Sequence, residues 1–227
     1  MFPQDDSALI AAELEPAPQS AIHHAAVVRA LAGRRRVLDH ALARLALGAG
    51  GLAEVAARLV ETLEHGGTVL VAGNGGSAAE AQHFAAELVG RFKRDRAPYP
   101  VLALTTDTAI LTAVANDYGY ADVFARQVRA FGQPGDLFLG FSTSGESENL
   151  VRALAAARER GMASAAITGA RSSRMERLAD VTVRMPLTDT ATVQELHMMA
   201  THILCEIVEA TLTARERPTA REGMPIQ

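Results

Sequence analysis

The sequence predicts an α/β fold, a three-layer αβα sandwich around a five-stranded, mainly parallel sheet, flanked by N-terminal and C-terminal helices. Five short apolar runs are typical of strands buried on both faces, at 68–72, 101–104, 136–141, 164–167 and 181–185. Helix-like segments separate these runs, so strand and helix alternate along the chain. That alternation favours right-handed βαβ crossovers and a parallel sheet.

The helices and tails follow in order along the chain. Residues 1–20 carry three prolines and several acidic side chains, and we expect a disordered tail there. A helix is predicted over 21–46 from its apolar spacing, and a second runs to about His65, where two glycines end it. Further helices are expected at 77–92, 108–115, 120–132, 147–160, about 172–178 and 191–213. Residues 214–227 are predicted to be a second disordered tail, which leaves a single domain over 21–213.

Composition excludes several classes of protein. The chain has 227 residues, 48% of them hydrophobic, which is enough to fill a core. Its net charge of -4 argues against nucleic-acid binding, which needs a basic surface. No apolar run reaches the roughly 18 residues of a membrane helix, and no signal peptide precedes residue 15. The single cysteine, Cys205, is interpreted as a small buried hydrophobe. We therefore expect a cytoplasmic protein that binds neither nucleic acid nor membrane.

A glycine-rich turn follows the first predicted strand. Its candidate ligand-binding residues are Asn74, Gly75, Gly76 and Ser77. Glycines let the backbone approach a ligand, and the helix N-terminus behind them favours an anion. The turn is no dinucleotide fingerprint, because the third glycine would fall at Ala78, and no Gly-Lys-Ser/Thr of a P-loop follows. A purely structural turn would explain one or two of the glycines.

A hydroxyl-rich turn follows the third predicted strand. Ser142, Thr143, Ser144 and Ser147 precede a predicted helix and would donate to a phosphate. An ordinary N-cap needs only one hydroxyl. Glu146 would repel a phosphate, and we expect it to point towards solvent. Because ligands bind beyond the carboxyl ends of the strands in such sheets, the two turns predict a site for a phosphorylated sugar.

The segment GNGGSAAEAQHFAAEL, with STSGES downstream, resembles the sugar isomerase (SIS) domain, and more closely the phosphoheptose isomerases. The likeness covers about residues 25–212 and includes RF at 91–92 and ANDYG at 115–119. It implies conversion of D-sedoheptulose 7-phosphate to D-glycero-D-manno-heptose 7-phosphate through an enediol. That reaction is the first step of nucleotide-activated heptose biosynthesis for surface polysaccharide, including lipopolysaccharide. The resemblance also implies a homotetramer with sites between subunits and one Zn²⁺ per subunit.

The resemblance assigns roles to four residues of this chain. Glu87 is expected to be the base at carbon and His202 the acid at oxygen, while His83, Glu87, Gln194 and His202 are expected to hold the metal. His83 and Glu87 lie one helical turn apart and share a face, although a plain surface pair has the same spacing. His202 is equally compatible with a core histidine, and His197 competes with it; the resemblance favours His202.

The remaining predicted site residues are Arg91, four positions after Glu87, and the neighbouring Asn116 and Asp117. They are expected to complete the substrate site. The sequence departs from the family at Ala191, where some members carry an acidic residue, so the hydroxyl contacts of that loop stay open.

Three alternative functions fit parts of the pattern. A replication-initiation regulator of the SIS fold shares the AQHFAA stretch but acts as a protein-binding scaffold, which has no need of Glu87 together with His202. A sugar-phosphate-sensing transcription factor needs a basic helix-turn-helix, for which residues 1–65 are too short and not basic enough. The third alternative is another phosphosugar isomerase, which would act on a hexose or pentose phosphate and would differ from a phosphoheptose isomerase only in its substrate.

Overall fold

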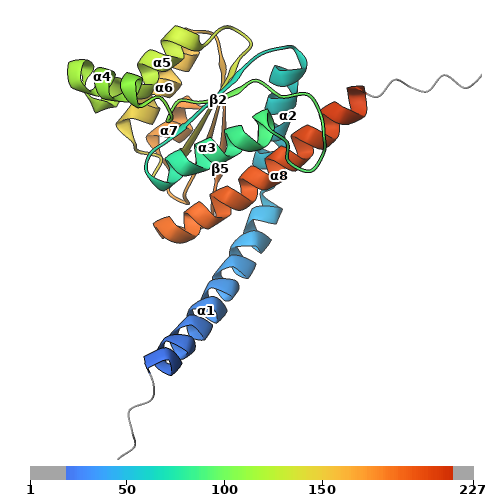
Figure 1. Cartoon of the computed structure of the whole chain (residues 1–227), viewed down its shortest axis with the longest axis vertical. Helices are drawn as coiled ribbons and strands as arrows, with labels where there is room; N and C mark the ends of the chain where they lie inside the picture. Colours follow the sequence, from blue (N-terminus) through green and yellow to red (C-terminus); the bar gives the residue numbers. More distant parts are fainter. Residues whose placement is uncertain (1–18, 217–227) are drawn as a thin grey trace, which may run out of the picture. The chain divides into compact units, whose positions relative to one another are not determined.

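The computed structural model describes residues 19–216 (Figure 1). The tails predicted at 1–20 and 214–227 lie outside the described residues except for their inner ends, which are helical. Those ends belong to α1 (Gln19–Leu47) and α8 (Thr190–Glu216). The chain divides into two compact units, Met1–His40 and Ala41–Gln227. The first contains most of α1, and the second contains the sheet, so a single domain over 21–213 stays a prediction.

The sheet has five strands in the order β2-β1-β3-β4-β5, and every neighbouring pair is parallel. The strands are β1 (Val69–Gly73), β2 (Val101–Ala103), β3 (Leu137–Ser142), β4 (Ala163–Thr168) and β5 (Val181–Arg184). All residues of the central strands β1 and β3 are buried, as their continuous apolar sequence predicts for strands covered on both faces. The predicted αβα sandwich is confirmed, and its sheet is wholly parallel.

Helices cover both faces of this sheet. On one face α2 (Gly50–Glu64) and α3 (Gly76–Val89) contact the strands, and α8 packs against both helices. On the other face α6 (Glu148–Glu159) contacts β3, β4, α5 (Val123–Phe131) and α7 (Arg174–Leu178). The remaining elements are α4 (Thr108–Tyr118) and a 3₁₀ turn, Tyr120–Asp122.

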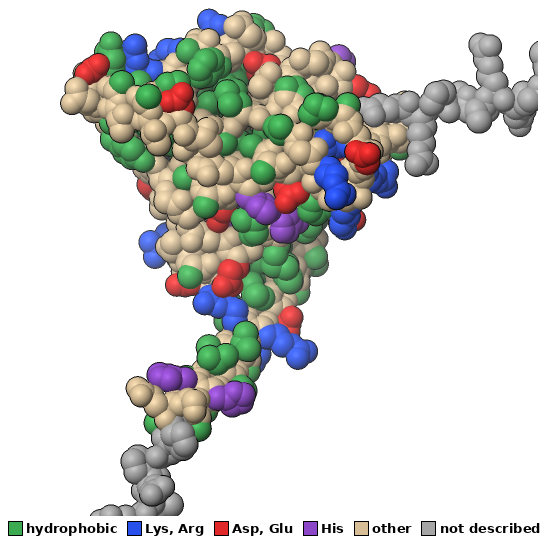
Figure 2. All heavy atoms as spheres, viewed as in Figure 1, with side chains coloured by type: hydrophobic (Ala, Val, Ile, Leu, Met, Phe, Trp, Pro, Cys, Tyr) green, Lys and Arg blue, Asp and Glu red, His purple; other side chains and the backbone are tan. Residues whose placement is uncertain are grey.

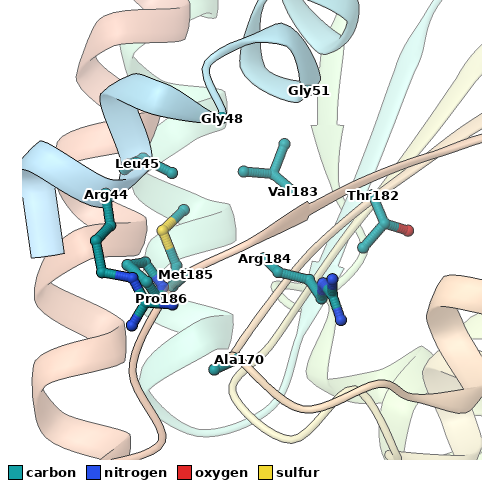
Figure 3. A pocket seen from close by; sticks show the side chains of 10 residues that line it. All are labelled: Arg44, Leu45, Gly48, Gly51, Ala170, Thr182, Val183, Arg184, Met185 and Pro186. Atoms are coloured by element: carbon teal, nitrogen blue, oxygen red, sulfur yellow. The ribbon is translucent and has the colours of Figure 1, made fainter.

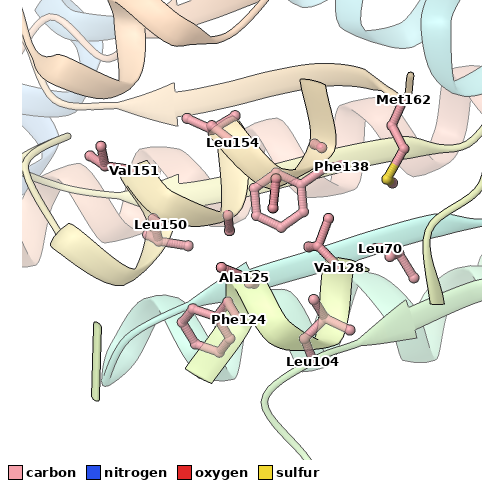
Figure 4. Packing of buried hydrophobic residues seen from close by; sticks show 14 of the residues in the cluster. Leu70, Leu104, Phe124, Ala125, Val128, Phe138, Leu150, Val151, Leu154 and Met162 are labelled. Atoms are coloured by element: carbon pink, nitrogen blue, oxygen red, sulfur yellow. The ribbon is translucent and has the colours of Figure 1, made fainter. Parts of the chain in front are cut away.

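The core beneath α5 and α6 shows how the strand period positions side chains. Leu70 of β1 and Phe138 of β3 point to this face and pack with Phe124, Leu150 and Leu154 from the helices (Figure 4). Phe141, an odd-numbered residue of β3, points the other way and contacts Phe84 of α3. Because side chains alternate along a strand, one apolar run supplies both cores.

Several predicted helices differ from the observed ones: the helix predicted over 108–115 continues to Tyr118, and the helix predicted over 191–213 continues to Glu216. The helix predicted over 77–92 ends at Val89, because the backbone of Gly90 leaves the helical region with ψ -109°. The helix predicted over 120–132 is a 3₁₀ turn followed by α5. Among residues 19–216, no helix is both long and apolar enough to cross a bilayer.

Candidate active site

The two predicted ligand turns lie side by side. In a sheet of this order, the strand connections reverse direction between β1 and β3, and ligands bind at the crevice formed there. The glycine-rich turn follows β1 and the hydroxyl-rich turn follows β3. These strands pair with Gly73 opposite Phe141, so both turns leave the sheet at the same crevice.

The glycine-rich turn is tightly packed. A Cβ at Gly73 would lie 2.2 Å from the backbone oxygen of Ser77, and Gly75 has φ 56°, a conformation that favours glycine. Asn74 and Asn149 exchange hydrogen bonds: Asn74 Nδ2 donates to Asn149 Oδ1 at 2.9 Å, and Asn149 Nδ2 donates to Asn74 Oδ1 at 2.8 Å. The Asn74 amide, predicted to contact substrate, therefore ties this turn to α6.

Tyr120 also contacts the glycine-rich turn. Its hydroxyl donates to Asn74 Oδ1 at 2.8 Å. Neither partner of Asn74 is predicted from the sequence, because they stand 46 and 75 positions away in the chain. No local pattern signals either contact.

The hydroxyl-rich turn is organised around Ser142. Its Oγ accepts the backbone N–H of Gly145 at 3.0 Å and lies 3.3 Å from Ser147 Oγ and 3.4 Å from Ser144 Oγ. The turn borders a cavity of about 270 Å³. The cavity is lined by Thr143, Ser144, Glu146, Ala170, Arg171, Ser172, Thr188 and Thr190. Three of the four predicted hydroxyls are therefore clustered, and Thr143 and Ser144 face open space.

Glu146 is exposed, as the sequence predicts, but it is not free in solvent. Its Oε1 accepts the backbone N–H of Arg174 at 2.9 Å. This hydrogen bond gives the carboxylate of the turn a partner at the start of α7.

Helices α3 and α8 run side by side in the same direction. The Gln194 amide packs against Gly76, where a Cβ would lie 2.3 Å from its Nε2. Further along, His197 lies beside Glu80, 117 positions earlier, and His202 lies beside His83, 119 positions earlier. Because the number of positions in sequence between facing residues is nearly constant, successive turns of α3 face successive turns of α8.

His83, Glu87 and His202 converge on this helix pair. His83 Nε2 lies 2.9 Å from His202 Nε2 and 3.2 Å from Glu87 Oε1. One ligand atom from each residue lies within 4.8 Å of the other two. The side chains of His83 and Glu87 are 39% and 22% exposed, so a ligand can reach them. Figure 2 shows histidine side chains at the surface of the face formed by α3 and α8.

His197 and His202 are both candidates for the site histidine of α8, and the structure distinguishes them. His202 stacks on the Phe92 ring, with centroids 5.5 Å apart and planes inclined by 25°. His197 is fully buried, with Nδ1 3.1 Å from Glu80 Oε2 and its ring beside Phe141. Only His202 joins the cluster with His83 and Glu87.

Among the described residues, no hydrogen bond links Arg91, Asn116 or Asp117 to this cluster. Arg91 was expected one turn after Glu87, but α3 ends at Val89, so that spacing argument is wrong; Arg91 is exposed beyond the helix. Asn116 and Asp117 are exposed in the last turn of α4, where Asn116 Nδ2 donates to Asp117 Oδ1 at 2.7 Å. Their contacts with substrate stay predictions.

A separate cavity of about 370 Å³ lies at the edge strand β5 (Figure 3). Arg44 and Leu45, Gly51 of α2, and Thr182 to Pro186 contribute to its lining. It contains none of the predicted site residues. It shares only Ala170 with the lining of the cavity beside the hydroxyl-rich turn.

Comparisons with known proteins agree with this geometry. The SIS domain family model matches residues 34–169. A phosphoheptose isomerase from Roseiflexus sp. (strain RS-1) is 53% identical over 158 residues, which covers 70% of this chain and 80% of that protein. The structure of a phosphoheptose isomerase from Francisella tularensis superposes with a TM-score of 0.77 at 36% identity, covering 81% of this chain and 98% of that one. The enzyme of the same name from Neisseria gonorrhoeae gives 0.75 at 38% identity, with 82% and 98% covered.

Proposed function

Because this chain belongs to the phosphoheptose isomerase family of SIS-domain proteins, we propose that it converts D-sedoheptulose 7-phosphate to D-glycero-D-manno-heptose 7-phosphate. The observation that carries this proposal is the convergence of Glu87 and His202, from helices far apart in sequence, on one half-exposed cluster. Wide separation of these two residues would have removed the acid–base pair. The scaffold alternative gains no support from the relatives, which are named as isomerases.

The substrate's phosphate is proposed to bind at the hydroxyl-rich turn. Ser142, Thr143, Ser144 and Ser147 supply hydroxyls, and the first backbone N–H groups of α6 favour an anion. Gly75 and Gly76 are exposed in the neighbouring glycine-rich turn, whereas Ser77 is 3% exposed. Along α3, Gly76 lies about 10 Å from His83 and about 16 Å from Glu87 at the helical rise, and the first of these distances is the length scale of an extended seven-carbon sugar phosphate. The reacting end of the sugar is proposed to lie beside His83, which Glu87 and His202 both contact.

The proposed chemistry is a pair of proton transfers through an enediol. Glu87 removes a proton from C1 of the ketose and returns a proton to C2, which creates the aldose. His202 protonates the oxygen on C2 and accepts the proton of the oxygen on C1. Asn116, Asp117, Arg91 and Gln194 are proposed to hold the substrate hydroxyls, which fixes the reacting carbons in place.

The same cluster fits a zinc ion. Two imidazole nitrogens and a carboxylate oxygen that converge within 4.8 Å form a donor set that Zn²⁺ prefers. We propose that His83, Glu87 and His202 hold one ion per subunit, with Gln194 as the fourth ligand that the family resemblance implies. When bound, the ion would act as a Lewis acid that polarises the substrate carbonyl.

A homotetramer is proposed from the apolar surfaces of two helices. On α8, Met199, Ile203 and Ile207 recur every four residues and are 36–42% exposed, which forms one stripe. On α1, Ile22, Val27, Val28, Leu31 and Val37 are 42–66% exposed. Such stripes indicate association with further copies. Leu204, next to Ile203 on α8, is fully buried in its own chain and does not belong to this stripe. The cytoplasmic location stays a prediction.

Turnover of sedoheptulose 7-phosphate by purified, zinc-supplied protein tests the proposed function. The wild type is expected to form the heptose phosphate, and Glu87→Gln and His202→Gln are expected to lose about 100-fold or more in kcat, the usual size of acid–base catalysis. Glu206→Gln and His65→Gln, exposed changes outside the cluster, serve as matched controls and should retain wild-type turnover. Full activity in Glu87→Gln or His202→Gln removes that residue from its role. A folded wild type without turnover rejects the function.

A further inference from the structure

A buried carboxylate lies two turns beyond His202 on the same helix. The Glu209 side chain is 1% exposed and accepts three consecutive backbone N–H groups from the segment after α3. Its oxygens lie 3.1 Å from the nitrogen of Phe92, 2.8 Å from that of Lys93 and 3.0 Å from that of Arg94. Consecutive N–H groups of this kind form an anion-binding concavity. Here a carboxylate of the same chain occupies it, so this segment is fixed to α8.

Arg96 joins the same carboxylate to the end of α3. Its side chain is also 1% exposed, and its Nε lies 3.3 Å from Glu209 Oε1. Its Nη2 donates to the backbone oxygen of Glu87 at 3.0 Å, and its Nη1 donates to that of Leu88 at 2.9 Å. Arg96 therefore contacts the backbone of a cluster residue directly while it pairs with Glu209 on α8.

Phe92 connects the contacts of Glu209 and Arg96 to the cluster of His83, Glu87 and His202. The N–H of Phe92 is one of the three held by Glu209, and its ring stacks on His202. The arrangement thus fixes Glu87 through its carbonyl and His202 through the stacked ring. We call Glu209, Arg96 and the backbone of 92–94 the Glu209 clamp.

We propose that the Glu209 clamp is a positioning device for the catalytic cluster, with Glu209 and Arg96 as positioning residues. This inference rests on the proposed isomerase site. A buried charge set costs desolvation and contributes little net stability compared with apolar packing, so stability alone does not explain it. Its contacts include the backbone oxygen of Glu87 and, through the Phe92 ring, the side chain of His202, two residues that must face each other across α3 and α8. Groups that orient metal-binding side chains typically change affinity or activity 10- to 100-fold when they are removed.

The test compares Glu209→Gln with Glu206→Gln. Both changes remove one carboxylate from α8, but Glu206 forms an ion pair with the side chain of Lys93, and both of those side chains are more than half exposed. Zn²⁺ affinity is measured by competition with a chromophoric chelator, and kcat and KM are measured with sedoheptulose 7-phosphate. In Glu209→Gln we expect about 10-fold losses in both Zn²⁺ affinity and kcat, with KM nearly unchanged. Glu206→Gln is expected to match the wild type.

Phe92→Leu keeps the test decisive if Glu209→Gln does not fold. This change removes the ring on His202 but leaves the clamp's backbone hydrogen bonds, and we expect about 3-fold losses in the same two quantities. A Glu209→Gln protein with a lower melting temperature but wild-type Zn²⁺ affinity and kcat would overturn the proposal. Wild-type affinity and kcat in Phe92→Leu would do so as well. If the wild type itself does not turn over the sugar, the proposed function fails, while the affinity comparison still decides the clamp.

Discussion

Among the individual residues of the cluster, His83 has the central place. Its Nε2 lies beside both His202 and Glu87, and the Phe92 ring stacks on His202. His197, one and a half turns earlier on α8, is instead paired with Glu80 in the interior. Two histidines of one helix therefore take different roles, because one faces the core and the other faces the half-exposed groove between helices.

Cys205 is expected to be inert to thiol reagents in the folded protein. It is fully buried, and desolvation, with Glu87 as the next contributor, raises the pKa of its thiol to about 12. Since the thiolate is the reactive form, an aromatic disulfide reagent should label no cysteine at about pH 8 in the native state and one per chain after unfolding. Rapid labelling of the native protein would contradict this burial.

Gly73→Ala is expected to destabilise the protein by about 1–3 kcal/mol, because the new Cβ would lie 2.2 Å from the backbone oxygen of Ser77, which cannot move as a side chain does. Gly50→Ala is the control, since no atom lies within 4 Å of its added Cβ, and it should leave stability unchanged or raise it by up to about 1 kcal/mol. Urea unfolding measures both. Equal stability of the two variants would contradict the close packing of Gly73 against the backbone of Ser77.

Among the elements, the contact of α8 with the segment after α3 adds a pH dependence to stability. Burial tends to raise the pKa of Glu209, but the N–H groups of Lys93, Phe92 and Arg94, together with Arg96, outweigh it and lower the pKa below its ordinary 4.5. A lowered folded pKa gives stability that is present above pH 4.5 and is lost as pH falls through the folded value.

Glu209→Gln is therefore expected to reduce the acid sensitivity of stability. The free energy of unfolding, measured from about pH 6 down to pH 3, should fall less steeply in the variant than in the wild type. Glu206→Gln should keep the wild-type slope. Parallel curves for the wild type and Glu209→Gln would show that Glu209 does not titrate with a lowered pKa.

The sequence predicts the elements better than their contacts. Apolar runs and glycines are local signals, so the five strands, both turns and the one-turn spacing of His83 and Glu87 could be predicted. Gly90 is a local signal for the end of α3 at Val89, although the apolar pattern alone predicts a helix to residue 92. The partners Asn149 of Asn74 and Arg96 of Glu209 could not be found, because only the folded chain brings together residues so far apart. For the same reason, the strand order needed the structure.

At the scale of the whole molecule, the apolar stripes of α1 and α8 predict assembly. Ile203→Glu places a charge in the α8 stripe, and if the proposed tetramer forms through this stripe the variant should form smaller species; kcat should fall as well if the site lies between subunits as proposed. Phe131→Glu, at a similarly exposed side chain on α5, is the control and should keep the wild-type mass. Light scattering after size exclusion measures the mass. A wild-type monomer with full activity would count against a site between subunits.

Hydrogen exchange at carbon during turnover most directly tests the claim that Glu87 and His202 form one acid–base site. With sedoheptulose 7-phosphate in D₂O, the wild type is expected to place deuterium on C2 of the heptose phosphate, since the base exchanges its proton with solvent before returning it. Glu87→Gln should incorporate none above background. Product that forms at the wild-type rate without deuterium, or equal incorporation by Glu87→Gln, would contradict the proposed site.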